Sequence, residues 1–207
     1  MKPEIVVGAL MFSLSASPAA FAAKPSDYVV TVHVQNDAPV DGWLLRSAEQ
    51  EASRVFRQIG VDLRWLAHGT APGGDGRSPE VSIVLMSAEM GARKSRIEQL
   101  SDKILARGSR WTGRAYVFCD RVSDVARQHA LSEGMVLAHA FTHELGHMIA
   151  NIGHDANGIM REALELRAAG FFGFTDAQKR AIREALAEAT AADAPRLALR
   201  LAPDPAR

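Results

Sequence analysis

The chain has 207 residues, of which 47% are hydrophobic, so we expect one domain whose core needs no disulfide to hold it together. Lysine plus arginine and aspartate plus glutamate are balanced at 24 each. Because no excess of basic side chains is available to neutralise a phosphate backbone, nucleic acid is excluded as a partner.

The first residues have the pattern of a signal peptide. Lys2 provides a positive charge, residues 5–16 form an apolar run, and Ala20-Phe21-Ala22 offers the small residues of a cleavage site. We expect cleavage after Ala22, so that residues 1–22 are removed and the protein is periplasmic or secreted. The alternative is an uncleaved anchor, but the apolar run is short for a bilayer span, and we expect no stable membrane association after cleavage.

The elements follow in the order expected of an α+β domain. β-branched and alternating segments predict strands at Tyr28–Val34, Val61–Leu66, Val81–Met86 and Ala115–Cys119. Apolar residues at helical spacing predict a helix at Leu44–Ile59. A long segment that is apolar on most sides predicts a second helix at Ser132–Ala150, and an N-cap at Thr175 predicts a final helix to about Ala189. Residues 87–110 are expected to form a helix and a loop. One folded domain is thus predicted over 23–192, followed by a loosely ordered tail over 193–207 that contains three prolines.

The long central helix carries the sequence His143-Glu144-Leu145-Gly146-His147. Residues four apart lie on one helical face, about 6 Å apart along the axis, so the two imidazoles can bind one zinc ion. Glu144 follows the first ligand, and its carboxylate can reach a water on the metal rather than the metal itself. The alternative is a core helix whose histidines only form hydrogen bonds, but burying these polar groups is costly unless they are paired or bind metal.

A catalytic zinc site has a third protein ligand and an open position. His154 is the natural candidate, because Asn151 or Gly153 can reverse the chain after the helix and return His154 to the metal. The alternatives for this ligand are acidic residues further along: Asp155, Glu162 and Glu165.

With His154 and the sequence Gly158-Ile159-Met160, the motif resembles that of the metzincin zinc peptidases, in which a methionine-bearing turn lies beneath the metal. The resemblance implies that Met160 is this methionine, an apolar floor rather than a ligand. It also implies a small domain with a mixed, mostly parallel sheet over an active-site helix, and a C-terminal helix below. The chain is also similar to uncharacterised exported bacterial proteins that combine such a motif with Gly-Ile-Met-Arg and Phe-Thr-x-x-Gln, here Gly158 to Arg161 and Phe174 to Gln178.

The sequence departs from the metzincin pattern at three positions. Ala150 replaces a helix-breaking glycine, His154 comes one residue later than in the clan, and Arg161 rather than a tyrosine follows shortly after Met160. The first two departures predict that the helix runs slightly further before the chain turns. The third removes a side chain that some clan members use near the metal.

Two further residues near the motif have simpler interpretations. His139 lies one turn before His143, and we expect it to be a hydrogen-bonded neighbour of the site rather than a ligand. Cys119 is expected to be a buried small hydrophobic residue; the alternative is a thiolate that binds the zinc.

These features predict zinc-dependent hydrolysis of peptide bonds by an endopeptidase with one catalytic Zn²⁺ ion, acting on a peptide or protein substrate with Glu144 as general base. The metzincin resemblance also implies that the strand Ala115–Cys119 forms the upper edge of the cleft. Arg161 and Tyr116 are candidate oxyanion donors. The alternatives are a non-catalytic zinc-binding module, which would not need Glu144, and a zinc hydrolase of non-peptide amides. A long groove favours peptides, whereas a closed pocket favours small amides.

Overall fold

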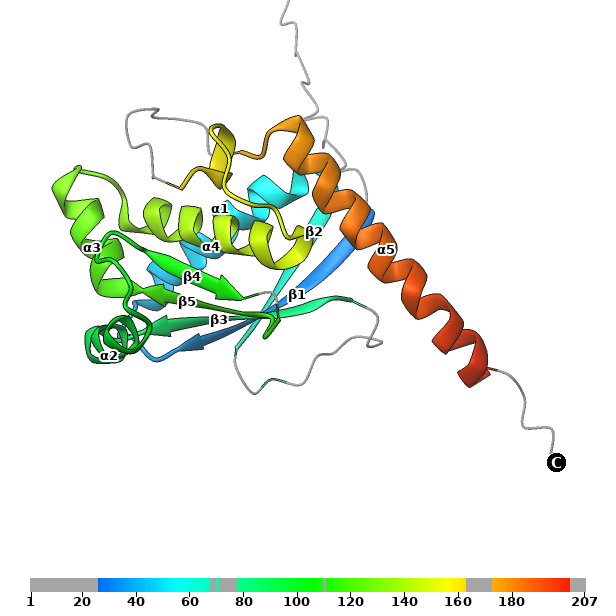
Figure 1. Cartoon of the computed structure of the whole chain (residues 1–207), viewed down its shortest axis with the longest axis horizontal. Helices are drawn as coiled ribbons and strands as arrows, with labels where there is room; N and C mark the ends of the chain where they lie inside the picture. The colour runs from blue at the N-terminus through cyan, green and yellow to red at the C-terminus, as the bar shows by residue number, and fades with distance from the viewer. Residues whose placement is uncertain (1–25, 68–69, 71–77, 110, 163–172, 202–207) are drawn as a thin grey trace, which may run out of the picture.

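A computed structural model describes residues 26–67, 70, 78–109, 111–162 and 173–201, with side chains up to residue 191 (Figure 1). The predicted signal peptide lies outside the described residues. The domain is α+β, as predicted, with a five-stranded sheet in the order β2-β1-β3-β5-β4. Its strands are β1 (Tyr28–Asn36), β2 (Val61–Ala67), β3 (Glu80–Met86), β4 (Ala106–Ser109) and β5 (Arg114–Phe118).

The sheet is parallel except for its last strand. β1 pairs in parallel with β2 and β3, and β3 pairs in parallel with β5, whereas β4 is antiparallel to β5. The prediction that Ala115–Cys119 forms the upper edge of the cleft was therefore wrong, because β5 lies between β3 and β4, and β4 is the edge strand. The sequence of β4, Ala-Arg-Gly-Ser, contains no β-branched or aromatic residue, so it carries no strand signal.

The helices cover both faces of the sheet (Figure 1). They are α1 (Gly42–Arg57), α2 (Ala88–Glu98), α3 (Cys119–Gln128), α4 (Glu133–Ala150), the short 3₁₀ helix η1 (Gly158–Met160) and α5 (Asp176–Leu201). Alternate residues of a strand point to opposite faces. Ile83 and Leu85 of β3 accordingly belong to the main core with α1 and α4, whereas Val84 and Met86 pack on the other face with Phe118.

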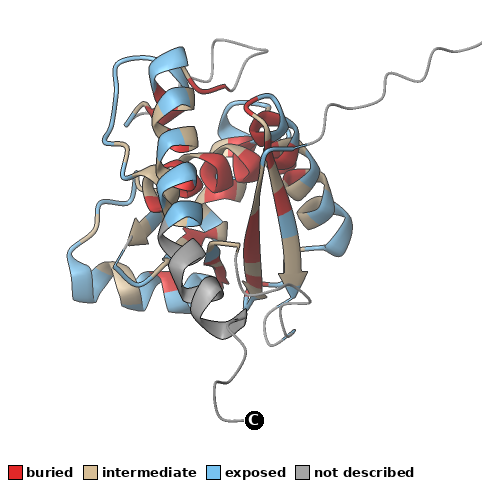
Figure 2. Cartoon of the chain, turned by 90° about the vertical axis from the view of Figure 1, so that its right-hand side faces the viewer, coloured by how far each residue is buried: buried red, intermediate tan, exposed pale blue. Residues whose placement is uncertain are grey.

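Helix α4 is the central element of the main core. Apolar residues surround most of its circumference, and eleven of its 18 residues are buried, so it packs against α1, α5 and β4 rather than presenting a polar face to water. Figure 2 shows that buried residues gather where the helices meet the sheet, whereas α5 is exposed along the side toward the viewer. The polar residues of the zinc motif are therefore embedded in an apolar helix.

Helix α5 begins where the sequence predicted but ends later. Thr175 Oγ1 accepts a hydrogen bond from the Gln178 backbone N–H at 3.4 Å, and Gln178 Oε1 accepts one from the Thr175 N–H at 3.0 Å, which is a capping box. The helix continues to Leu201 and so includes residues 193–201 of the predicted tail. Within the described ranges, no helix is both long and apolar enough to cross a membrane.

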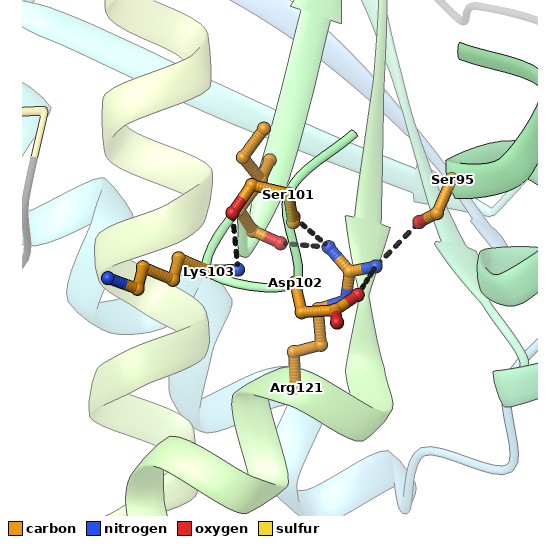
Figure 3. A network of polar contacts seen from close by, with 6 residues as sticks. Ser95, Ser101, Asp102, Lys103 and Arg121 are labelled. Carbon is orange, nitrogen blue, oxygen red and sulfur yellow. Dashed lines mark hydrogen bonds and ion pairs between the residues drawn. The ribbon is translucent and has the colours of Figure 1, made fainter. Parts of the chain in front are cut away.

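The connection from α2 into β4 is anchored by Arg121 of α3 (Figure 3). Its guanidinium donates to the carbonyl oxygens of Ser101 and Ile104 at 2.9 and 2.8 Å. It also donates to Ser95 Oγ and pairs with Asp102 at 3.5 Å. Charged donors make strong hydrogen bonds to carbonyl oxygens, so this network fixes the point at which the chain enters the edge strand.

Candidate metal centre

The first two predicted ligands lie one turn apart on α4 with their rings oriented by backbone carbonyls. His143 Nδ1 is 2.9 Å from Ile159 O, and His147 Nδ1 is hydrogen-bonded to Ile152 O. A carbonyl oxygen only accepts hydrogen bonds, so each Nδ1 carries the proton. In the neutral ring, Nε2 then presents a lone pair.

These two lone pairs face each other. His143 Nε2 and His147 Nε2 are 2.9 Å apart, and with both protons on Nδ1 neither nitrogen has a proton to donate to the other. Such a pair is favourable only when a cation lies between the nitrogens. Burial is the main cause that lowers the pKa of His143 to about 4 and also lowers the pKa of His147, so both rings are neutral at pH 7, as metal ligation requires.

His154 returns to the same point from the segment after α4. The candidate ligand atoms of His143, His147 and His154 all lie within 4.8 Å of one another. Three imidazoles with room for a further ligand match the donor set of catalytic zinc. The chain reverses at Asn151, the left-handed C-cap of α4 with φ 53°, and not at Gly153.

The structure also places the alternative ligands. The Asp155 carboxylate accepts a hydrogen bond from Gln178 Nε2 at 2.9 Å, so it is engaged by α5. Glu162 is exposed on the cleft wall, and Glu165 lies outside the described residues. Cys119 starts α3 instead of ending a strand, and burial raises the pKa of its thiol to about 12, so the thiolate form that binds zinc is strongly disfavoured there.

Met160 lies directly against the turn of α4 that carries both ligands. It is fully buried, and a Cβ atom built on Gly146 would come within 2.7 Å of its sulfur and 3.2 Å of Phe174 Cε1. The glycine of the motif therefore allows Met160 to approach the helix backbone between the two histidines. Met160 thus packs against the backbone of α4, and its role as the methionine of a metzincin turn stays a prediction.

Glu144 points toward the edge strand. Only 5% of the residue is exposed, and a Cβ atom on Gly108 of β4 would lie 2.6 Å from its Oε2. Burial raises the pKa of the Glu144 carboxyl to about 7, although a hydrogen bond from the Gly108 backbone and the charge of Arg107 act in the opposite direction. A carboxyl with a pKa near neutrality, beside three candidate ligands, is suited to accept and return a proton.

Among the described residues, β4 pairs with β5 alone, and the cleft at this centre extends around its other edge. All four residues of β4 line it, as do His139 and Arg161, and Trp111, at the turn into β5, lines it with 99% of its surface exposed. Tyr116, a candidate oxyanion donor, also lines this cleft, but its ring packs on the far face of the sheet, with Lys94 Nζ 3.9 Å from the ring centroid. An open cleft along an edge strand suits an extended chain better than a small compact molecule.

His139 lies one turn before His143, with ring centroids 6.2 Å apart. It lies outside the three-histidine group, in line with its predicted role as a neighbour of the site. Burial, followed by the charge of His143, lowers the pKa of His139 to about 3.

These pKa shifts predict how the stability of the metal-free protein depends on pH. His139 and His143 have pKa values of about 3 and 4 when folded and 6.5 when unfolded, so the unfolded chain binds more protons below pH 6.5. Glu144 acts in the opposite direction between pH 4.5 and 7, because its pKa is raised by folding. With two histidines against one glutamate, we expect the free energy of unfolding to fall as pH is lowered from 6.5 to 4, measured by urea titration after metal removal. In Glu144→Gln the fall should be steeper, and a flat profile in both proteins would contradict the prediction.

Comparison with solved structures identifies the fold. A zinc-dependent peptidase from Methanocorpusculum labreanum (strain Z) aligns with a TM-score of 0.52 and 14% identity, over 73% of this chain and 99% of that one. The chain has the fold of a zinc-dependent peptidase. An archaemetzincin from Methanopyrus kandleri aligns at 14% identity over 78% of this chain and 97% of its own, with a TM-score of 0.48. No family model and no curated protein matches the sequence.

Two features of the site had no signal in the sequence. Gly108 belongs to a strand that composition does not predict, and its contact with Glu144 arises only when β4 pairs with β5 and packs on α4. Gln178 was noted as part of a helix start, but its hydrogen bond to Asp155 spans 23 residues of sequence.

Proposed function

We propose that this chain is an exported, metzincin-like zinc endopeptidase with one catalytic zinc ion. The observation that carries the proposal is the convergence of His143, His147 and His154, with candidate ligand atoms within 4.8 Å of one another, beside the buried carboxylate of Glu144. The fold, which is that of a zinc-dependent peptidase, supports it.

In this proposal the three imidazoles hold zinc, which when bound polarises the scissile carbonyl and lowers the pKa of water. Glu144 takes the proton from the attacking water and passes it to the leaving amine. The Gly108 backbone holds the Glu144 carboxylate at the edge strand. The free edge of β4 binds an extended peptide substrate by adding it as a strand, which places the peptide beside Glu144.

The competing functions fit the site less well. A zinc-binding module without catalysis has no use for a buried carboxylate whose pKa is raised to about 7. A hydrolase of small non-peptide amides would need a closed pocket, whereas this cleft follows an exposed edge strand. Export rests on the N-terminal sequence pattern alone, and it places the substrate in the periplasm or outside the cell.

The first test is the metal content of the purified protein from residue 23 onward, compared with His154→Ala. We expect about one zinc per chain in the wild type and strong loss in the variant, because two ligands remain where three are needed. Elemental analysis after dialysis measures the metal, and a peptide library digested in parallel and read by mass spectrometry measures hydrolysis.

Each of three other results would change the proposal in a different way. Equal zinc in both proteins would move the third ligand to Asp155 or a downstream glutamate. Absence of zinc from both, even after metal is added, would leave a core helix with histidines and remove the proposed activity. Zinc without cleavage of any library peptide would favour the non-catalytic module or a non-peptide amide as substrate.

A further inference from the structure

The third imidazole is held differently from the other two. His143 and His147 extend from a buried helix, and each Nδ1 is bound to a carbonyl oxygen. His154 is exposed and lies on the segment between α4 and η1. Its position therefore depends on how this segment is fixed rather than on a helix.

The residue after His154 accepts a local hydrogen bond from the Asn157 N–H at its Oδ1, at 3.3 Å, and is bound to two neighbouring elements. The Asp155 backbone N–H donates to Met160 O at 2.9 Å, which closes the segment onto η1. The Asp155 carboxylate accepts a hydrogen bond from Gln178 Nε2 at 2.9 Å. The hydrogen bond from Gln178 connects the segment that carries His154 to α5.

Gln178 uses both ends of its amide. Only 3% of the residue is exposed, and its Nε2 also donates to the backbone carbonyl of Asn157 at 3.2 Å. Its Oε1 accepts from the Thr175 N–H at 3.0 Å. Gly158, with φ +71°, lies so close that a Cβ atom there would be 2.9 Å from Gln178 Oε1. A buried amide that is hydrogen-bonded at both its nitrogen and its oxygen, with tight packing around it, has one orientation.

We propose that Gln178 is a positioning residue for the third metal ligand: its amide donates to Asp155 and Asn157 and so fixes the segment that presents His154. This inference rests on the proposed function, in which His154 binds zinc. A segment that is held in place before metal binding loses less conformational freedom on ligation. Residues that orient metal ligands typically change metal affinity by about 10–100-fold when replaced.

The deciding variant is Gln178→Glu. The glutamate keeps an oxygen for the Thr175 N–H, so the capping box survives, but it has no N–H₂ group and places a carboxylate against that of Asp155. We expect zinc affinity to fall about 10–100-fold, measured by competition with a chelator of known affinity. If Gln178→Glu is too unstable to purify, Gln178→Met is measured in the same way.

Exchanging the donor and the acceptor between positions 155 and 178 should restore zinc affinity. In Asp155→Asn with Gln178→Glu, the new asparagine donates to the new glutamate, so the link between the two side chains is restored with its direction reversed. We expect the double variant to bind zinc at least about fivefold more tightly than Gln178→Glu alone. Thr175→Ala, which weakens the start of α5 without touching Asp155, is the matched control and should keep wild-type affinity.

The outcomes separate the two proposals. Zinc binding by the wild type that is unchanged in Gln178→Glu overturns the positioning role and leaves the proposed function standing. Equal losses in Thr175→Ala and Gln178→Glu also overturn it, because the effect would then come from α5 stability. No rescue by the exchange overturns the part of the role that runs through Asp155. A wild type that binds no zinc overturns the proposed function and this inference with it.

Discussion

Glu144→Gln is expected to lower kcat/KM for peptide hydrolysis by about 10²–10⁴-fold while the protein keeps its zinc. The amide has nearly the same shape as the carboxylate, and its oxygen can still accept the bond from the Gly108 backbone. It cannot take a proton from water, so the general base is lost while the three imidazoles are untouched. Initial rates on a library-derived peptide, with zinc content measured on the same preparation, test this.

The pH dependence of the wild type gives a second measure of the same group. Burial raises the pKa of Glu144 to about 7 in the metal-free site, and a bound dication favours the ionised form and lowers that pKa. A base acts only when deprotonated, so kcat/KM should fall on the acidic side of a midpoint at or below pH 7. This fall of kcat/KM at acidic pH should be absent from the residual activity of Glu144→Gln. Normal hydrolysis by the variant would remove Glu144 from the mechanism.

The parts of the site that the sequence predicted are those determined by one element. Helix α4 begins and ends within one residue of the prediction, because its 18 mostly apolar residues form a run too long for a strand. The spacing of His143, Glu144 and His147 then follows from helix geometry alone. Only the reversal before His154 required a choice between Asn151 and Gly153, and the left-handed conformation lies at Asn151.

The parts that the sequence missed depend on contacts between elements. Helix α3 starts at Cys119, where an apolar run suggested that a strand continued. β4 is stabilised by pairing with β5 and not by its own composition. Because β4 was not predicted, β5 was taken for the edge strand. The tertiary pairing decides which strand forms the edge of the sheet.

Gly108→Ala is the second change for which we expect a large effect, a fall in kcat of about 10²-fold with zinc retained. The new Cβ atom would lie 2.6 Å from Glu144 Oε2 and 3.5 Å from Met148 Cγ, so the carboxylate must move away from β4. The backbone at Gly108 is not in the left-handed region, so alanine itself is tolerated there. The expected fall in kcat therefore comes from displacement of the Glu144 carboxylate.

A double-mutant cycle with Glu144→Asp tests whether the two residues act through this contact. Aspartate is one methylene shorter and leaves room for the new Cβ atom, so Gly108→Ala should cost much less in the Glu144→Asp background than in the wild type. Ser109→Ala, on the same strand, is the matched control and should change kcat little. Independent losses in the two backgrounds would mean that Gly108→Ala acts by distorting β4. Full activity in Gly108→Ala would mean that the edge strand does not position Glu144 during hydrolysis.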